Sequence, residues 1–171
     1  RYMNNITIVK NYRNAETLRG VELSEVVRMI QGCEFRNEVL QVSSISLYTE
    51  LKRQDDGSVD GANNYTDKLP RVCFASELEN RNHQRLRKSY TGMVLLEVNN
   101  LVSYDESVAI RQGAALMPQT LLAFVGASGR SVKIVCRGEL FGGGLPEVED
   151  DIKQFHLNLY QTARRAYMNQ F

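Results

Sequence analysis

Hydrophobic residues in the second half of the chain gather in short runs separated by small or polar residues. Residues 93–96 read Met-Val-Leu-Leu after a glycine, a run typical of a strand that is buried on both faces. Residues 121–125 predict a second buried strand, and residues 132–136 predict a third. The segment between these last two strands reads Gly-Ala-Ser-Gly-Arg-Ser and has the composition of a tight turn. We therefore expect a hairpin over residues 121–136.

Apolar residues at helical spacing predict three helices. Residues 21–30 predict the first, which Gly32 is expected to end. Ser-Tyr-Asp-Glu at residues 103–106 is a typical helix start and leads to Met117, before a proline. Residues 147–171 predict a long final helix, whose acidic beginning suits the positive end of the helix dipole. Its apolar stripe consists of Ile152, Phe155, Leu159, Ala163 and Tyr167.

The remaining segments are less regular. Residues 5–12 are β-branched and predict a strand, as do residues 71–75 after Pro70. Residues 36–53 fit neither period cleanly, and we favour a helix in their first half. Residues 54–69 are rich in Asp, Asn and Gly and predict an exposed surface loop, or alternatively a lid that touches substrate. The glycines at 142–144 lack the Lys-Ser/Thr ending of a phosphate loop, so we interpret them as a linker.

This order of strands and helices predicts an α+β fold, with one mostly antiparallel sheet flanked by helices. A length of 171 residues with 43% apolar residues suits a single domain with a sizeable core. The first residues lack a hydrophobic signal region, and no run approaches membrane length. We expect a single cytoplasmic domain that is an N-terminal fragment of a longer protein.

Charge is nearly balanced, with 21 basic and 20 acidic residues and a net charge of +1. There is no overall basic field, so only a local patch could indicate a nucleic-acid partner. Residues 77–88 hold such a local concentration: Arg81, His83, Arg85, Arg87 and Lys88. This segment is either a solvated charged face or a phosphate-contacting surface.

Three cysteines, Cys33, Cys73 and Cys136, are odd in number and widely spaced. Without a CxxC pair they indicate neither a disulfide framework nor a zinc site, and we expect buried, reduced thiols. The two histidines have no identifiable catalytic partners, and His156 is expected at the edge of the last helix. HExxH, P-loop and dinucleotide-binding motifs are absent from the sequence.

Candidate chemistry lies at the end of the central strand and in the hairpin turn. Glu97 and Asn99 are two residues apart, so on a strand they point to the same side. Phosphoryl-transfer sites combine carboxylates that hold a divalent metal with cations and turn amides that hold phosphates. Glu97 is thus a candidate metal ligand. The candidate triphosphate contacts are Ser128, Arg130, Ser131 and Lys133. Polar residues are also common at strand ends without any such role.

Three stretches, in this order, resemble one protein family. They are Leu-Pro followed by Phe at residues 69–74, Thr-Gly-Met-Val-Leu-Leu-Glu-Val-Asn-Asn-Leu at residues 91–101, and Ala-Phe-Val-Gly-Ala-Ser-Gly-Arg-Ser-Val-Lys at residues 123–133. The family is the BT4734-like domain, also called the VirE N-terminal domain, found at the front of primase/helicase-like proteins of mobile elements. The final helix is similar too, so the resemblance covers residues 69–171, with a looser fit before them.

That family in turn resembles the archaeo-eukaryotic primase, or primase-polymerase, superfamily. The resemblance implies a primase-polymerase-like fold with an RRM-like core, and a role in DNA replication by a mobile element. It implies a nucleoside triphosphate and single-stranded or primed DNA as ligands, Mg²⁺ or Mn²⁺ as cofactor, and a helicase domain or subunit as partner. It does not imply a membrane.

Carried over by position, Glu97 and Asn99 stand at the two positions of the family's Asp-x-Asp motif, where they would be the catalytic metal ligands. The family's nucleotide-binding Ser-Gly-x-Gly-x-Lys turn falls on residues 128–133. It therefore assigns nucleotide contacts to Ser128, Gly129, Arg130, Ser131 and Lys133. Primases proper have a histidine where Lys133 stands.

Departures from the family pattern weaken the metal site. Glu97 and Asn99 replace two aspartates, so one formal charge is missing, and an amide oxygen is a weaker ligand than a carboxylate. Ser131 replaces a glycine, which could hinder close approach of the backbone to phosphate. The family's third acidic motif is expected after the last helix. We therefore do not expect an intact two-metal site, and we expect polymerase activity to be weakened or lost.

Two functions remain open. The first is a primase-like nucleotide- and DNA-handling domain of a mobile-element replication protein, and the intact Ser-Gly-Arg-Ser-Val-Lys turn favours it. The second is a non-catalytic descendant that binds nucleic acid or a partner, and the loss of two aspartates favours it. Its backbone contacts would come from Arg81, Arg85, Arg87 and Lys88, with binding that weakens steeply with salt. A third interpretation is that the motif positions are relics in a structural domain.

Overall fold

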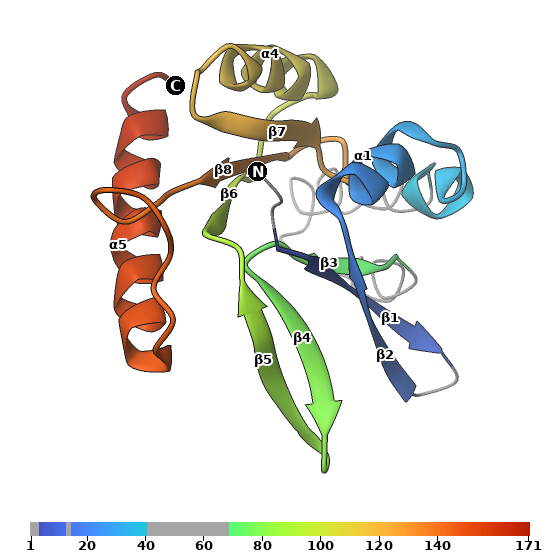
Figure 1. Ribbon diagram of the computed structural model, residues 1–171. Coiled ribbons are helices and arrows are strands. Elements are labelled where there is room, and N and C mark those ends of the chain that lie inside the picture. The colour runs from blue at the N-terminus through green and yellow to red at the C-terminus, as the bar shows by residue number, and fades with distance from the viewer. Residues whose placement is uncertain (1–3, 13–14, 41–68) are drawn as a thin grey trace, which may run out of the picture.

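The computed structural model describes residues 4–12, 15–40 and 69–171 (Figure 1). The α+β class and the antiparallel pairing are confirmed, because helices flank antiparallel sheets. The expectation of a single sheet was wrong: within the described residues the strands divide into three sheets, with strand orders β2-β1-β3, β4-β5 and β6-β8-β7. None of the described helices is long and apolar enough to cross a membrane.

The first sheet is built around β1 (Ile6–Tyr12), which pairs with β2 (Ala15–Val21) on one side and β3 (Arg71–Cys73) on the other. β1 and β3 confirm predicted strands. β2 was not predicted, because Ala-Glu-Thr-Leu-Arg-Gly has little β-branched character and depends on its pairing with β1. The first predicted helix is confirmed as α1 (Leu23–Gln31), and the N–H of Gly32 ends it by donating to the Arg28 carbonyl, 2.9 Å away.

Residues 36–40 are helical, in agreement with the helix favoured for this stretch. The rest of that prediction, over residues 41–53, lies outside the described residues. The predicted loop at residues 54–69 also lies outside them, except for its last residue.

The charged segment forms a hairpin of β4 (Ser76–Arg81) and β5 (Gln84–Tyr90) that extends away from the helices (Figure 1). Its two-residue turn has positive φ at both Asn82 (51°) and His83 (62°), as a type I′ turn requires. The hairpin is joined to the first sheet by the buried hydroxyl of Thr7. That oxygen donates to the Ser76 carbonyl and accepts from the Leu78 amide, both at 2.8 Å.

The third sheet contains the three buried strands expected from the sequence. They are β6 (Met93–Val98), β7 (Thr120–Val125) and β8 (Val132–Arg137), with β8 in the centre. The predicted hairpin is confirmed as β7 and β8. Antiparallel pairing of β6 with β8 places Glu97 directly opposite Lys133.

Helices α4 (Tyr104–Ala115) and α5 (Glu149–Met168) confirm the other two helix predictions. Ser103 caps α4, because its Oγ accepts from the Glu106 amide at 3.1 Å while the Glu106 carboxylate accepts from the Val102 amide at 2.7 Å. Such reciprocal capping explains why this start could be recognised in the sequence.

Each face of the third sheet packs into its own hydrophobic cluster. Val94 and Leu96 join the cluster formed with α4 and α5, which includes Ala163 and Tyr167 of the predicted stripe. Met93 lies on the opposite face, in the cluster formed with β1 and α1. The prediction that β6 is buried on both faces is therefore confirmed, and the sheet is a rigid wall between two cores.

The three cysteines are free. Cys136 is buried as expected, and burial raises the pKa of its thiol to about 11. Cys73 is only partly buried, and Cys33 is exposed because it lies in the bend that follows α1. The prediction that all three thiols are buried was therefore wrong for Cys33.

Candidate functional site

Alternation along the third sheet sends Glu97 and Lys133 to the face of the β1 and α1 cluster. Leu95 and Val135, two residues away on the same strands, pack on that face. The Lys133 ammonium lies 2.5 Å from Glu97 Oε1, and both side chains remain partly exposed. The acid and the base that the sequence placed in separate motifs thus form one cross-strand ion pair.

The carboxylate of Glu97 is held in its ionised form. The hydrogen bond from Lys133 lowers its pKa, and the lysine charge and a hydrogen bond from Asn99 act in the same direction, while partial burial opposes them. Asn99 therefore lies beside Glu97, as expected from their spacing. Glu97 carries its negative charge at neutral pH.

A compact turn joins β7 to β8. The Gly126 amide donates to the Ser131 carbonyl and the Gly129 amide donates to the Gly126 carbonyl, both at 2.9 Å. Gly129 has a φ of 75°, which favours glycine. A Cβ at Gly126 would lie 2.1 Å from Ser131 Oγ, so a larger residue there would force the serine side chain to move.

Hydrogen bonds from the start of α4 brace this turn. Ser107 Oγ donates to the Gly129 carbonyl at 3.0 Å, and the Leu101 amide donates to the Arg130 carbonyl at 3.0 Å. Arg130, a predicted phosphate contact, directs its Nε to the Leu101 carbonyl, 2.9 Å away. Ser128 Oγ accepts from the Arg130 amide at 3.2 Å. These contacts stabilise the conformation of the turn.

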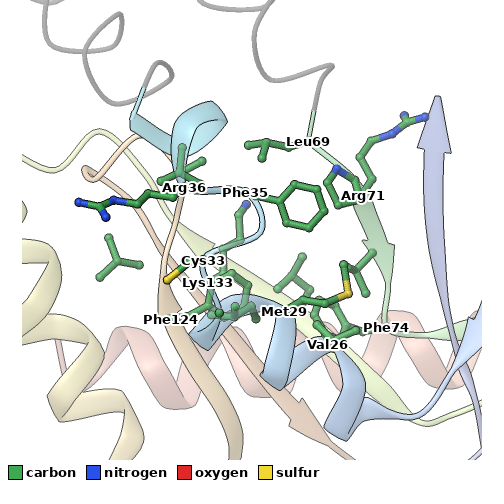
Figure 2. A pocket seen from close by; sticks show the side chains of 18 of the residues that line it. Val26, Met29, Cys33, Phe35, Arg36, Leu69, Arg71, Phe74, Phe124 and Lys133 are labelled. Atoms are coloured by element: carbon green, nitrogen blue, oxygen red, sulfur yellow. The ribbon is translucent and has the colours of Figure 1, made fainter. Parts of the chain in front are cut away.

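A cleft of about 790 Å³ opens on the face that carries Glu97 and Lys133 (Figure 2). Its walls are α1, the bend after it, the segment around β3, and the exposed end of the third sheet. The described lining is mainly apolar, with Glu97 and Lys133 as polar groups in one wall. Asn99 and the turn residues Ser128, Gly129, Arg130 and Ser131 do not belong to this described lining.

The oxygen ligands at this place suit one divalent cation and not two. No group of three or more His, Cys, Asp or Glu side chains that could hold a metal ion occurs among the residues that the structure describes. Glu97 supplies one carboxylate and Asn99 one amide oxygen. Mg²⁺ is commonly held by one or two carboxylates together with water and substrate phosphates, so this pair fits a single ion shared with phosphate.

The basic residues predicted as nucleic-acid contacts are each paired with an acid. Arg85 pairs with Glu16 of β2, and Arg87 lies 3.5 Å from Glu149 of α5. The two remaining pairs lie within the hairpin: Arg81 with Glu79 at 3.1 Å, and Lys88 with Glu77 at 3.6 Å. This pairing lowers the positive charge that the hairpin presents.

His156 lies on α5, away from the cleft, where α5 contacts the base of the hairpin. Its Nδ1 is 2.9 Å from the hydroxyl of Tyr90, a residue that also packs edge-on against Phe155. Burial, and then the charge of Arg87, lower the pKa of His156. Burial raises the pKa of Tyr90 to about 12. His156 is thus a half-buried contact residue on α5, as expected.

The apolar side of the cleft was missed from the sequence. Val26 and Ile30 were recognised as part of the apolar face of a helix, but that face lines the cleft as well as the core, and Met29 joins it there. Phe35 and Arg36 also line it, and the only sequence signal was an aromatic residue just after the helix end. Segments distant in sequence meet here, so no local pattern reveals the cleft.

Comparison with known protein families gives a match over the part of the chain that contains the motif residues. A family model described as BT4734-like, N-terminal domain, matches residues 64–171, more than half of the chain. The chain belongs to this family. The match to the BT4734-like domain includes Glu97, Asn99 and the whole turn up to Lys133, whereas α1 and Phe35 precede it. No curated protein and no solved structure matches the chain.

Proposed function

We propose that this BT4734-like domain binds the triphosphate of a nucleotide at the Glu97–Lys133 end of the cleft. The observation that carries the proposal is the ion pair itself: an ionised carboxylate and an ammonium lie 2.5 Å apart in the wall of a large cleft, beside a braced turn. In a mobile-element replication protein, such binding would serve a primase-like domain that handles nucleotides and DNA next to a helicase.

Lys133 would contact the phosphates by exchanging one anionic partner for another. Its ammonium now donates to Glu97 Oε1 and would donate instead to a phosphate oxygen. Glu97 and Asn99 would then hold a Mg²⁺ or Mn²⁺ ion, which supplies neutralising charge for the phosphates when bound. The turn keeps its shape in this exchange, since its bonds to Leu101 and Ser107 do not involve Lys133.

We propose binding with little or no primer synthesis. Strand synthesis by two-metal chemistry needs a second ion to activate the attacking oxygen. The described residues offer one carboxylate and one amide, which fit one ion. The presence of Glu97 and Asn99 in place of two aspartates is thus consistent with a domain that still binds the nucleotide but has weakened polymerase activity.

The alternative, a nucleic-acid-binding module that uses the charged hairpin, has weaker support. Affinity for nucleic acid arises largely from cations that replace the counterions of phosphate. Arg81, Arg85, Arg87 and Lys88 are already paired with acids, so this exchange would gain less there. We place template DNA in the proposal as a ligand of the domain, without assigning it to this hairpin.

Calorimetric titration of a deoxynucleoside triphosphate, with and without Mn²⁺, tests the proposal. Binding should depend on Mn²⁺ and weaken strongly in Glu97→Ala and Lys133→Ala. Lys88→Ala is the matched control, because it removes a lysine of another cross-strand ion pair outside the cleft. Absence of binding at millimolar nucleotide, or equal loss in Lys88→Ala, would contradict the proposal.

A further inference from the structure

We propose that Phe35 forms the base-binding side of the same cleft, by stacking against the nucleobase of the ligand. This inference rests on the proposed function, because it assigns the part of the nucleotide that Lys133 does not hold. Figure 2 shows the Phe35 ring and the Lys133 side chain extending into the cleft, from the bend after α1 and from β8 respectively.

Phe35 differs from the other aromatic side chains in the described walls. Phe74 is 5% exposed and belongs to the core cluster, and Phe124 packs against that cluster. Phe35 lines the cleft, is partly exposed, and belongs to neither core cluster of the described chain. Its ring is therefore the aromatic surface in this lining that a ligand can cover without disturbing the core.

A cation steadies the ring in this position. The Lys10 ammonium of β1 lies over the Phe35 ring, 5.6 Å from its centroid. Such a contact is a weak attraction at an exposed site. The ring thus has a partner on the first sheet, although it lies in a bend without regular secondary structure.

Together the walls suit an amphipathic ligand with one flat apolar end and one anionic end. The apolar part of the cleft, which includes Met29 and Leu69, suits the faces of a base, and Lys133 suits the phosphates. Its volume of about 790 Å³ falls within the range of small-molecule sites. A purely apolar ligand would leave the Glu97–Lys133 pair unused, and an inorganic anion would leave the aromatic wall unused.

Two ligands, one with a base and one without, test the two ends of the cleft independently. Calorimetry with Mn²⁺ would measure the affinity for dATP and for inorganic tripolyphosphate, on wild type and Phe35→Ala. Stacking of a base on an aromatic residue is worth about 1–3 kcal/mol, so Phe35→Ala should weaken dATP binding about fivefold or more. Tripolyphosphate binding should stay within about twofold, because that ligand has no base. Phe141→Ala is the matched control, since it removes an exposed aromatic ring that does not line the cleft.

A tryptophan at this position gives a second measurement. The chain contains no tryptophan, so Phe35→Trp would introduce a single tryptophan as the fluorescent probe and keep an aromatic surface at this position. Quenching by dATP and not by tripolyphosphate is the expected result.

The possible outcomes distinguish failure of the Phe35 assignment from failure of the proposed function. Equal weakening of both ligands in Phe35→Ala, no weakening of dATP binding, or the same loss in Phe141→Ala would overturn the role of Phe35. If Lys133→Ala still abolishes tripolyphosphate binding in that case, the proposed function stands. If dATP quenches Phe35→Trp but Lys133→Ala binds both ligands normally, the phosphate assignment fails and the base assignment stands. If wild type binds neither ligand, both are overturned.

Discussion

The charged end of the β6-β8-β7 sheet and the β4-β5 hairpin both place acids opposite bases on neighbouring antiparallel strands. At the sheet end, Glu97 and Lys133 lie in the wall of a large cleft, on a sheet that is packed on both faces. In the hairpin, pairs such as Lys88 with Glu77 lie on a projecting two-stranded ribbon. The same kind of ion pair therefore lies in the wall of a ligand-sized cleft in one region and on a projecting ribbon in the other.

The hairpin holds more basic residues than the sheet end, yet the sheet end is the better candidate site. Exposed ion pairs contribute little to stability and are readily screened by salt. The Glu97–Lys133 pair is also partly exposed, but it lies in the wall of an apolar cleft, where a ligand can exchange with one of its members. The position of a charge relative to a cavity is thus more informative here than the number of charges.

Truncation of an apolar side chain should give the largest difference between the two regions, in the free energy of unfolding. Ile134 of β8 is 0% exposed in the cluster with α4 and α5, whereas Leu86 of β5 is 38% exposed. Ile134→Ala should cost about 3 kcal/mol of unfolding free energy because it leaves a cavity, and Leu86→Ala less than about 1 kcal/mol. Urea denaturation measures both. Equal costs would mean that the hairpin is as tightly integrated as the sheet.

Replacement of the two paired lysines should give the next largest contrast. Lys133→Ala should weaken triphosphate binding about thirtyfold, or about 2 kcal/mol, because a charge-assisted hydrogen bond to phosphate is lost. Lys88→Ala should change it less than about twofold. Calorimetry measures both affinities, and similar values for the two variants would remove the distinction between the regions.

Acid should loosen the junction of α5 with the hairpin through His156. Its pKa is lowered in the folded state, so the unfolded chain binds more protons between that lowered pKa and the ordinary value of about 6.5. Its contribution to stability is full above about 6.5 and is lost as the pH falls through this window. Between about pH 7.5 and about pH 5.5, wild type should lose about 1–2 °C more in Tm than His156→Gln. An identical acid response of His156→Gln and wild type would show that protonation of His156 does not affect the junction.

Neutralisation of the hairpin should have the smallest effect. We expect the combined variant Arg81→Gln, Arg85→Gln, Lys88→Gln to bind single-stranded DNA with nearly the wild-type salt dependence. Each lost phosphate contact would reduce the slope of log K against log salt by about 0.7. A reduction of about 2 would mean that the ion pairs open on DNA, and would restore the hairpin as a nucleic-acid surface.

Prediction from sequence succeeded where local signals were strong. The apolar run of β6, the capped start of α4 and the stripe of α5 each specify their own structure over a few residues. The β4-β5 hairpin was not predicted because its strands are polar on both faces and show no alternation. Even so, the same segment was correctly recognised as a concentration of charge.

The sequence predicted which residues belong to the candidate site, but not how they are arranged in space. Glu97 and Lys133 were both named, yet their pairing depends on strand order, which places β8 between β6 and β7. Arg130 was expected at the phosphates, and the structure shows its Nε bonded to Leu101. The cleft itself arises from packing of α1 and β3 against the third sheet, and such tertiary contacts leave no local pattern.

The Glu97–Lys133 ion pair also bears on which ligands can enter in the proposed function. A cation that arrives alone must separate Glu97 from Lys133 and leave the ammonium without a counterion, and an anion alone must do the reverse. A metal–phosphate complex supplies both charges in one step. Cation and anion should therefore bind with positive cooperativity, each raising the affinity for the other by the same factor. Under the proposed function the lysine would thus compete with the cation for Glu97, and would favour the metal-bound form of a nucleotide over either ion by itself.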